Sequence, residues 1–337
     1  MKKVRVAIHG FGRIGRSILR ALMTTRQETG IEVVMVTDLA PLETCAYLFE
    51  FDSVFGPFPG QVETSNVALM VNGTKVPFYQ IDPTADSLDL TGVDVFLECS
   101  GRATRRDIAE RGLLAGAKSV LISGPSDAAD VTLVLGANDA AFTGQRIVSN
   151  ASCTTNALAP LLRLLDDRYG VSSGHMNTIH CYTSSQPTID TAGKDLARSR
   201  AAALSMVPTT SSATKLIDRV VPQLAGRITG SAVRVPVASV SAVDLVVKLD
   251  RTGADFKADL KAAVAQSAVL GWTDKPLVST DLRRRAESLV LAGPELILGP
   301  EFTRLFGWYD NEWGFSNRMI DVALKMGAAQ TEENTHG

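Results

Sequence analysis

The sequence has no long run of hydrophobic residues. A membrane-spanning helix needs about 20 consecutive apolar residues, and no stretch approaches that length. The apolar residues after Met1 are interrupted by Arg5, His9 and Gly10, which is not the pattern of a signal peptide. We therefore expect no membrane partner and no secretory leader.

Cysteine is also scarce, with 4 residues in a chain of 337. Cys45, Cys99, Cys153 and Cys181 are widely spaced and match no metal-ligand pattern. This spacing indicates neither a disulfide framework nor a metal site. A reducing, cytoplasmic location fits it best.

Neither sign of charge dominates, because 34 lysines and arginines stand against 36 aspartates and glutamates. The formal net charge of -2 gives no general attraction to nucleic acid. The short basic run Arg283-Arg284-Arg285 is more typical of a solvated surface. Small-molecule partners are expected, and a length of 337 residues with 45% hydrophobic content is ordinary for about two globular domains.

A glycine motif near the N-terminus predicts a dinucleotide site. Residues 4–9 alternate like a buried strand, and residues 16–22 place apolar side chains at helical spacing. Between them, Gly10, Gly12 and Gly15 form a G-x-G-x-x-G motif, which lets a pyrophosphate approach the backbone at a helix start. The chain should therefore begin with a doubly wound (Rossmann) domain.

An acidic residue ends the second expected strand, over residues 31–37. Asp38 follows the glycines at the distance where a carboxylate accepts hydrogen bonds from the adenosine ribose. The same charge would repel a 2′-phosphate, so the sequence favours NAD over NADP.

Segments 93–101 and 119–125 are short apolar strands that end in Ser/Gly turns, with a helix expected over 105–115. An open parallel sheet binds its ligand at the carboxyl ends of its strands. The candidate cofactor contacts at these ends are Ser100, Gly101 and Ser123. The Asn72-Gly73 pair between alternating runs predicts a small antiparallel hairpin.

After residue 153 the pattern changes to longer strands, which indicates a second, α+β domain. Segments 176–183, 228–237 and 239–249 alternate without helices between the last two, which is typical of an antiparallel or mixed sheet. Segment 184–207 has little apolar periodicity and predicts a long loop.

Cys153 begins a leucine-rich segment that predicts a helix. Unpaired N–H groups and the helix dipole at that position favour a thiolate, and hence a nucleophile, although local context also allows a buried structural cysteine. His180 lies in an apolar strand, where it is either a packed side chain or a base. A nucleophile, a proton acceptor and a hydride acceptor are together what cofactor-dependent aldehyde oxidation requires.

With these features the chain resembles the phosphorylating glyceraldehyde-3-phosphate dehydrogenase family nearly from end to end. The matching stretches are Ile8 to Arg16, Phe51 to Val54, Glu98 to Arg102, Ser152 to Asn156, Thr178 to His180, Val207 to Thr210, Arg234 to Pro236 and Trp308 to Gly314.

The resemblance implies an NAD-dependent oxidoreductase of glycolysis that acts on D-glyceraldehyde 3-phosphate and inorganic phosphate. Cys153 would add to the aldehyde as a thiolate, and His180 would lower the thiol pKa and accept a proton as hydride leaves. The matched contacts are Thr183 and Arg234 for the substrate phosphate, Ser152, Thr154, Ser211 and Ser212 for the attacking phosphate, and Arg13, Ile14, Asp38, Ser123 and Asn311 for the cofactor.

The resemblance also implies an assembly and a domain organisation. Family members are usually homotetramers. The NAD-binding domain would cover 1–152 together with a C-terminal helix over 317–337, and the catalytic domain would cover 153–316.

Several positions depart from the family pattern. Ser211-Ser212 stands where Thr-Gly is usual, and Ser185-Gln186-Pro187 where Asp-Gln-Arg is usual. Thr191-Ala192 replaces the Leu-Pro of NAD-specific members, which allows some NADP use. His9 and Phe315 also differ from the usual asparagine and tyrosine.

Two alternatives stay open. An erythrose-4-phosphate dehydrogenase would share the fold and the Cys/His pair but release its acyl group to water, and residues 164–170 and 311–319 resemble that group. A non-catalytic nicotinamide-binding regulator is the alternative from a different class, and the presence of both Cys153 and His180 argues against it.

Overall fold

The computed structural model describes residues 3–81 and 88–336. The chain forms two compact units, of which the first comprises Met1–Leu133, Ala140–Ala151 and Ser316–Gly337. The second comprises Val134–Asp139 and Ser152–Phe315. Within the described chain, no helix combines the length and the apolar character that crossing a membrane requires.

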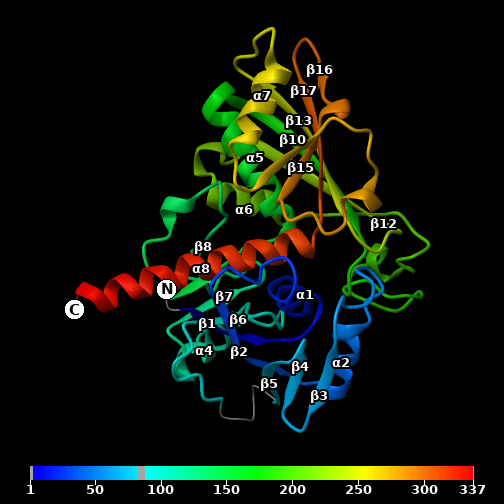
Figure 1. The fold of residues 1–337 in the computed structure, drawn as a ribbon. Helices are drawn as coiled ribbons and strands as arrows, with labels where there is room; N and C mark the ends of the chain where they lie inside the picture. The colour runs from blue at the N-terminus through cyan, green and yellow to red at the C-terminus, as the bar shows by residue number, and fades with distance from the viewer. Residues whose placement is uncertain (1–2, 82–87, 337) are drawn as a thin grey trace. The chain divides into compact units, whose positions relative to one another are not determined.

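In the first unit, nine strands of the described chain form one sheet (Figure 1). The order across the sheet is β3 (Val62–Ser65), β4 (Ala68–Val71), β5 (Thr74–Gln80), β2 (Ile31–Asp38), β1 (Val4–His9), β6 (Val95–Glu98), β7 (Ser119–Ile122), β9 (Ile147–Ser149) and β8 (Val131–Thr132). All neighbours from β5 to β8 are parallel. Because β2 and β6 flank β1 on opposite sides, the strand order reverses at β1, as in a doubly wound sheet. The predicted fold class is confirmed here.

The antiparallel edge of this sheet is the hairpin predicted at Asn72-Gly73. Strands β4 and β5 pair from Val71 with Thr74 onward. Asn72 and Gly73 both have positive φ, 49° and 76°, which is the conformation that two-residue hairpin turns of type I′ require.

The helices of the first unit lie between and after these strands. They are α1 (Arg13–Leu22), α2 (Leu42–Glu50), α3 (Arg106–Ala109), α4 (Arg111–Leu114) and the part of α8 (Trp313–His336) from Ser316 onward. The helix predicted over 105–115 is thus two short helices that meet at Glu110. Gly112 lets α4 approach the sheet, because a Cβ there would lie 2.6 Å from the Phe96 side chain.

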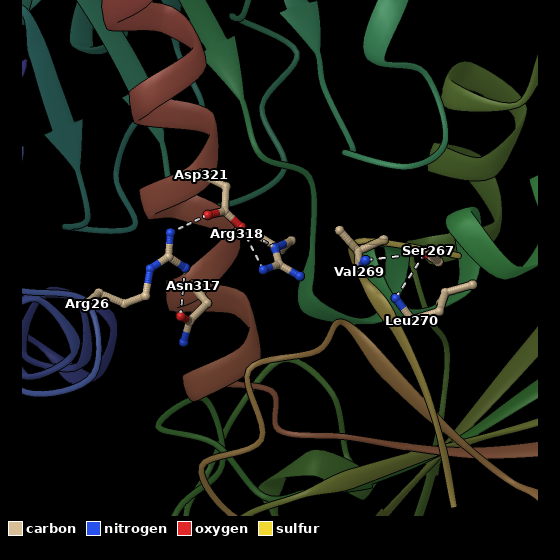
Figure 2. Close-up of polar contacts among 7 residues, drawn as sticks. All are labelled: Arg26, Ser267, Val269, Leu270, Asn317, Arg318 and Asp321. Atoms are coloured by element: carbon tan, nitrogen blue, oxygen red, sulfur yellow. Dashed lines mark hydrogen bonds and ion pairs between the residues drawn. The ribbon is translucent and has the colours of Figure 1, made fainter. Parts of the chain in front are cut away.

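A charged cluster fastens α8 within the first unit (Figure 2). Arg26 Nη2 lies 2.6 Å from an Asp321 carboxylate oxygen, and its Nη1 donates to Asn317 Oδ1 at 3.1 Å. Asp321 also pairs with the buried Arg318 at 2.6 Å. A C-terminal helix from about residue 317 was predicted, and these contacts hold its first turns.

The second unit contains a mixed sheet. The order across the sheet is β11 (Val207–Thr209), β12 (Ile228–Val235), β10 (Val171–Cys181), β13 (Ser241–Leu249), β17 (Thr303–Tyr309), β15 (Leu289–Ala292) and β14 (Leu270–Thr273). β16 (Ile297–Leu298) pairs with β17. The pairs β10–β12 and β14–β15 are parallel and the others antiparallel. The expected mixed or antiparallel sheet is confirmed.

The two strands around Pro236 are not neighbours. β12 and β13 pair with opposite edges of β10, which lies between them in the sheet (Figure 1). β10 also begins earlier than the predicted strand, at Val171, and ends at Cys181. The chain therefore returns from β10 to β12 by a crossover, through the 184–207 loop and a helix, as parallel pairing requires.

The helices of this unit are α5 (Cys153–Tyr169), α6 (Ala213–Val220) and α7 (Phe256–Ala265). After α7, the Ser267 hydroxyl accepts hydrogen bonds from the N–H groups of Val269 and Leu270 and turns the chain into β14 (Figure 2). The predicted 184–207 loop contains only one turn of 3₁₀ helix, at Ala197–Ser199.

Candidate active site

Cys153 is the first residue of α5, as the sequence predicts. Ser152 caps the helix, because its Oγ accepts a hydrogen bond from the Thr155 N–H at 3.0 Å. Ala151 has a left-handed φ of 54°, which turns the chain sharply before the cap. Cys153 is a half-buried residue, and its thiol stands at a capped helix N-terminus.

His180 lies beside this thiol. Its Nε2 is 3.6 Å from Cys153 Sγ, and its Nδ1 is 2.7 Å from the Cys181 carbonyl oxygen. The ring is 5% exposed and meets the edge of the Tyr309 ring at 6.0 Å between centroids. The two predicted catalytic residues are therefore in contact, with one ring nitrogen toward the sulfur.

Tyr309 braces this arrangement from the buried side. Its hydroxyl lies 2.9 Å from Thr154 Oγ1 and 2.8 Å from Thr178 Oγ1, so one side chain joins the start of α5 to β10. Tyr309 belongs to a stretch that matches the family, but its spacing from Cys153 in the sequence carried no signal of this role.

Burial opposes ionisation of both members of the pair. Burial raises the pKa of the Cys153 thiol, while the Thr154 hydrogen bonds, the Arg234 charge and the N–H groups of the helix start lower it less. The pKa therefore lies above its ordinary value, whereas the helix start alone predicts a lower one. Burial and the neighbouring Arg234 charge lower the pKa of His180 to about 4. Burial therefore disfavours the charged form of both groups, the thiolate and the imidazolium.

Arg234 completes the cluster. It lies on β12 directly opposite His180 in the parallel register, which puts both side chains on the same face of the sheet. Its Nη1 is 2.8 Å from His180 Nδ1 and 2.9 Å from the Cys181 carbonyl oxygen. Its half-buried guanidinium is suited to hold an anionic group next to the thiol.

The other predicted phosphate contacts are Thr183, Ser211 and Ser212. None of them has a described hydrogen bond to Cys153, His180 or Arg234. Thr183 Oγ1 lies 2.9 Å from Ser185 Oγ, just after β10. Ser211 Oγ accepts from the Ala213 N–H at 3.1 Å, and Ser212 precedes α6 without a side-chain cap. The N-terminus of α6 and the Ser212 hydroxyl are suited to an anion.

Arg198 is a residue that the sequence reasoning did not assign to the site. Its guanidinium donates to Thr209 Oγ1 at 2.8 Å and to the Thr210 carbonyl at 3.3 Å, next to Ser211. Its positive charge also contributes to lowering the pKa values of His180 and Arg234. The only sequence feature that could have indicated this role is the presence of basic residues in the 184–207 loop, which has little apolar periodicity.

A groove in the first unit brings predicted cofactor residues together. Its lining includes Gly10, Gly12, Asp38 and Ser100. Gly10 has a φ of 87°, and a Cβ on it would lie 2.6 Å from the Ser100 nitrogen. A Cβ on Gly12 would meet nothing within 4 Å, and α1 has no side-chain cap. Open space beside the N-terminus of α1 fits a pyrophosphate.

Asp38 also holds the glycine loop in place. Its Oδ2 accepts from the Phe11 N–H at 2.5 Å and its Oδ1 from the Ala40 N–H at 2.8 Å. His9, which replaces the usual asparagine, lies 2.7 Å from Thr37 Oγ1 beneath the same loop. The carboxylate is therefore fixed at the edge of the groove, where a ribose would reach it.

The other predicted cofactor contacts have varied surroundings. Arg13 is ion-paired with Asp52, and Gly15 packs where a Cβ would lie 2.2 Å from the Gly10 oxygen. Gly101 has a φ of 74°, the Ser123 N–H donates to the Glu98 oxygen at 3.0 Å, and Ile14 is half-buried. Asn311, in the second unit, accepts from the Cys181 thiol at 3.2 Å.

Comparison with known proteins places both units in one family. Residues 4–106 match the model of the glyceraldehyde 3-phosphate dehydrogenase NAD binding domain, and residues 152–311 match that of the family's C-terminal domain. The chain is 46% identical over 331 residues to glyceraldehyde-3-phosphate dehydrogenase of Xanthobacter flavus, with 96% of this chain and 98% of the relative covered.

Other relatives agree over the same length. The enzyme of Cereibacter sphaeroides is 46% identical over 330 residues, covering 96% of this chain and 98% of the relative. That of Pseudomonas aeruginosa is 44% identical over 331 residues, covering 97% and 99%. This chain belongs to the glyceraldehyde-3-phosphate dehydrogenase family and carries both its NAD-binding domain and its C-terminal domain.

Proposed function

We propose that this protein catalyses the NAD-dependent oxidative phosphorylation of D-glyceraldehyde 3-phosphate to 1,3-bisphosphoglycerate. The observation that carries this proposal is the contact of Cys153 Sγ with His180 Nε2 at 3.6 Å, at the start of α5. It supplies a nucleophile and a base in hydrogen-bonding reach. The names of the full-length relatives, all glyceraldehyde-3-phosphate dehydrogenases, support the choice of substrate.

Oxidation begins when Cys153 Sγ gives its proton to His180 and bonds to the aldehyde carbon. His180 returns that proton to the carbonyl oxygen, which forms a thiohemiacetal and leaves the ring neutral. His180 Nε2 then accepts the hydroxyl proton as the hydride leaves the same carbon, and a thioester remains on the sulfur. Bound NAD would supply the hydride acceptor. Arg234 and Thr183 would hold the substrate phosphate and so position the aldehyde over the thiol.

Inorganic phosphate ends the cycle by attacking the thioester carbon. The new oxygen–carbon bond replaces the sulfur–carbon bond, so the acyl phosphate leaves and Cys153 is regenerated. Ser211 and Ser212 before α6, together with Ser152, Thr154 and Arg198, supply hydroxyl, N–H and guanidinium donors for that anion. An enzyme with this pocket should prefer phosphate over water.

The first-unit groove would hold the cofactor. Gly10, Gly12 and the N-terminus of α1 would receive the pyrophosphate, and Asp38 would accept the ribose hydroxyls. Arg13, Ile14, Gly15, Ser100, Gly101 and Ser123 would complete the cradle, and Asn311 would contact the nicotinamide side. Thr191-Ala192 leaves room for some NADP use.

The decisive experiment compares two aldehydes with and without phosphate. We expect NADH to form from glyceraldehyde 3-phosphate only when phosphate or arsenate is present. Faster turnover of erythrose 4-phosphate that ignores phosphate would assign the protein to erythrose-4-phosphate oxidation with water as the acyl acceptor. No NADH from either aldehyde, with an ordinary thiol reactivity at Cys153, would indicate a non-catalytic regulator.

The assembly, location and domain roles are also part of the proposal. We expect a homotetramer in the cytoplasm, with residues 1–152 and 317–337 binding NAD and residues 153–316 carrying the chemistry. Four large apolar side chains of the 184–207 loop support association with other copies, because each is more than 70% exposed: Ile189, Leu196, Leu204 and Met206.

A further inference from the structure

Cys181 and Asn311 meet at one edge of the sheet in the second unit. Strands β10 and β17 pair with opposite sides of β13, whose first residues lie opposite Ile179 of β10 and Tyr309 of β17. Cys181 is the last residue of β10, and Asn311 follows the end of β17 by two residues. The sheet therefore brings together two residues that are 130 positions apart in the chain.

The side chain of Cys181 is 0% exposed, and its thiol donates to Asn311 Oδ1 at 3.2 Å. Burial raises the pKa of this thiol to about 12, so the sulfur keeps its proton. A thiol sulfur is only a weak acceptor, whereas an amide oxygen is a good one. A protonated thiol beside an asparagine therefore pairs with the amide oxygen rather than with the NH₂ group.

The backbone around Asn311 is fixed independently of this thiol. Asp310 Oδ1 accepts from the Glu312 N–H at 3.0 Å and from the Trp313 N–H at 2.8 Å. The remaining freedom of the buried Asn311 side chain is rotation of its amide, which exchanges the oxygen with the NH₂ group. The bond from Cys181 selects the orientation in which Oδ1 faces the thiol and the N–H groups of Nδ2 point away from it.

We propose that Cys181 is a positioning residue that fixes the Asn311 amide with its NH₂ group outward, as a hydrogen-bond donor for the carboxamide oxygen of a nicotinamide. This inference rests on the proposed function, which assigns Asn311 to the nicotinamide side. A carboxamide carries both an acceptor oxygen and a donor NH₂ group, so an asparagine that was free to turn could pair with either. A fixed donor pairs with the oxygen alone.

The backbone of Cys181 has a separate task. Its carbonyl oxygen lies 2.7 Å from His180 Nδ1 and 2.9 Å from Arg234 Nη1, and its N–H donates to Ser241 Oγ at 3.1 Å. A substitution of the side chain leaves these backbone groups in place. The role of the thiol toward the cofactor can therefore be tested apart from the role of the backbone toward the base.

Calorimetry with two ligands separates positioning of Asn311 from a general effect on the fold. NAD carries the nicotinamide, whereas ADP-ribose has the same adenosine, pyrophosphate and second ribose without it. Cys181→Ala should weaken NAD binding by about fivefold, the loss expected for one neutral hydrogen bond, and leave the affinity for ADP-ribose unchanged. Cys181→Ser differs from this variant by one hydroxyl donor and should recover most of the NAD affinity.

Two further measurements follow the bond itself. Asn311→Leu should weaken NAD at least as much as Cys181→Ala does, and the double variant should lose no more than Asn311→Leu alone, because the thiol acts through the amide. In infrared spectra of the free protein, the S–H stretching band that disappears in Cys181→Ala identifies this thiol among the 4 cysteines. That band should move to higher frequency in Asn311→Leu, where the thiol has lost its acceptor.

An unchanged NAD affinity in Cys181→Ala, equal losses for NAD and ADP-ribose, or additive losses in the double variant would overturn the inference. An S–H band that ignores Asn311→Leu would overturn it as well, and this comparison remains decisive if Cys181→Ala does not fold, with Cys181→Ser then identifying the band. None of these measurements requires turnover. Failure of the parent protein to form NADH from either aldehyde would instead contradict the proposed function, so the two failures are distinguishable.

Discussion

Cys153 differs from an exposed reactive thiol in that burial opposes its ionisation. His180 Nε2, 3.6 Å from the sulfur, is the group positioned to take the thiol proton. We expect Cys153→Ser to lower the rate of NADH formation by roughly 10³-fold or more, because a serine hydroxyl is a far weaker nucleophile at neutral pH. NAD affinity, measured by calorimetry, should stay close to the parent value. Retained oxidation would place the nucleophile elsewhere.

His180 also couples stability to pH. Its pKa is about 4 in the folded chain and 6.5 as the ordinary value, so the unfolded chain binds more protons between these limits. The stability contributed by the neutral buried ring is complete above pH 6.5 and is lost as the pH falls toward 4. We expect wild type to lose up to roughly 3 kcal/mol more than His180→Gln over this window in urea unfolding. Parallel curves for the two proteins would contradict the buried neutral ring.

Asp38 has two roles, and a single substitution would not separate their effects on cofactor binding. Its carboxylate faces the cofactor groove and also accepts from the Phe11 N–H at 2.5 Å. Asp38→Asn keeps an acceptor for that N–H and removes the charge, whereas Asp38→Gly removes both. We expect Asn to raise the ratio of NADP to NAD kcat/KM about tenfold, which is about 1.4 kcal/mol. Gly should shift the ratio and also weaken both cofactors. An unchanged ratio in both variants would remove Asp38 from ribose recognition.

At the scale of the element, the start of α5 joins stability to phosphate recognition. Ser152 Oγ caps the helix at the Thr155 N–H. Ser152→Ala should lower the free energy of unfolding by about 1 kcal/mol, and Ser152→Asn, which can also cap, should restore most of it. Both variants should raise the KM for phosphate, because both lack the hydroxyl that we assign to that anion. An alanine variant as stable as the parent would show that the cap is dispensable.

Elements with a strong local signal were predictable. The strand, glycine loop and helix over residues 4–22 are specified by alternation, Gly10 and helical spacing, and the hairpin by Asn72-Gly73, because these depend on nearby residues. The order of strands in the second sheet was not predictable, since alternation around Pro236 does not reveal that β10 lies between β12 and β13.

The candidate site divides in the same way. Cys153 was recognisable because a helix start is a local feature. His180 was recognisable only because the glycine loop occurs in the same chain and because the chain resembles the family. Arg198 and the bracing hydroxyl of Tyr309 reach the site through tertiary contacts between distant segments, for which single-sequence periodicity has no signal. The raised pKa of the thiol escaped prediction because burial depends on the whole unit.

At the scale of the whole molecule, the 184–207 loop predicts association. Leu196 and Leu204 are 85% and 84% exposed, and burying such a side chain against another copy contributes about 1.5–3 kcal/mol. The double variant Leu196→Glu/Leu204→Glu should therefore weaken assembly by at least about 10²-fold in dissociation constant, as measured by light scattering over a dilution series. Leu114→Glu is a matched control, because Leu114 is 82% exposed but lies on α4, outside the loop. If the control dissociates as readily as the double variant, or the double variant stays fully assembled, the loop is not the surface that holds the copies together.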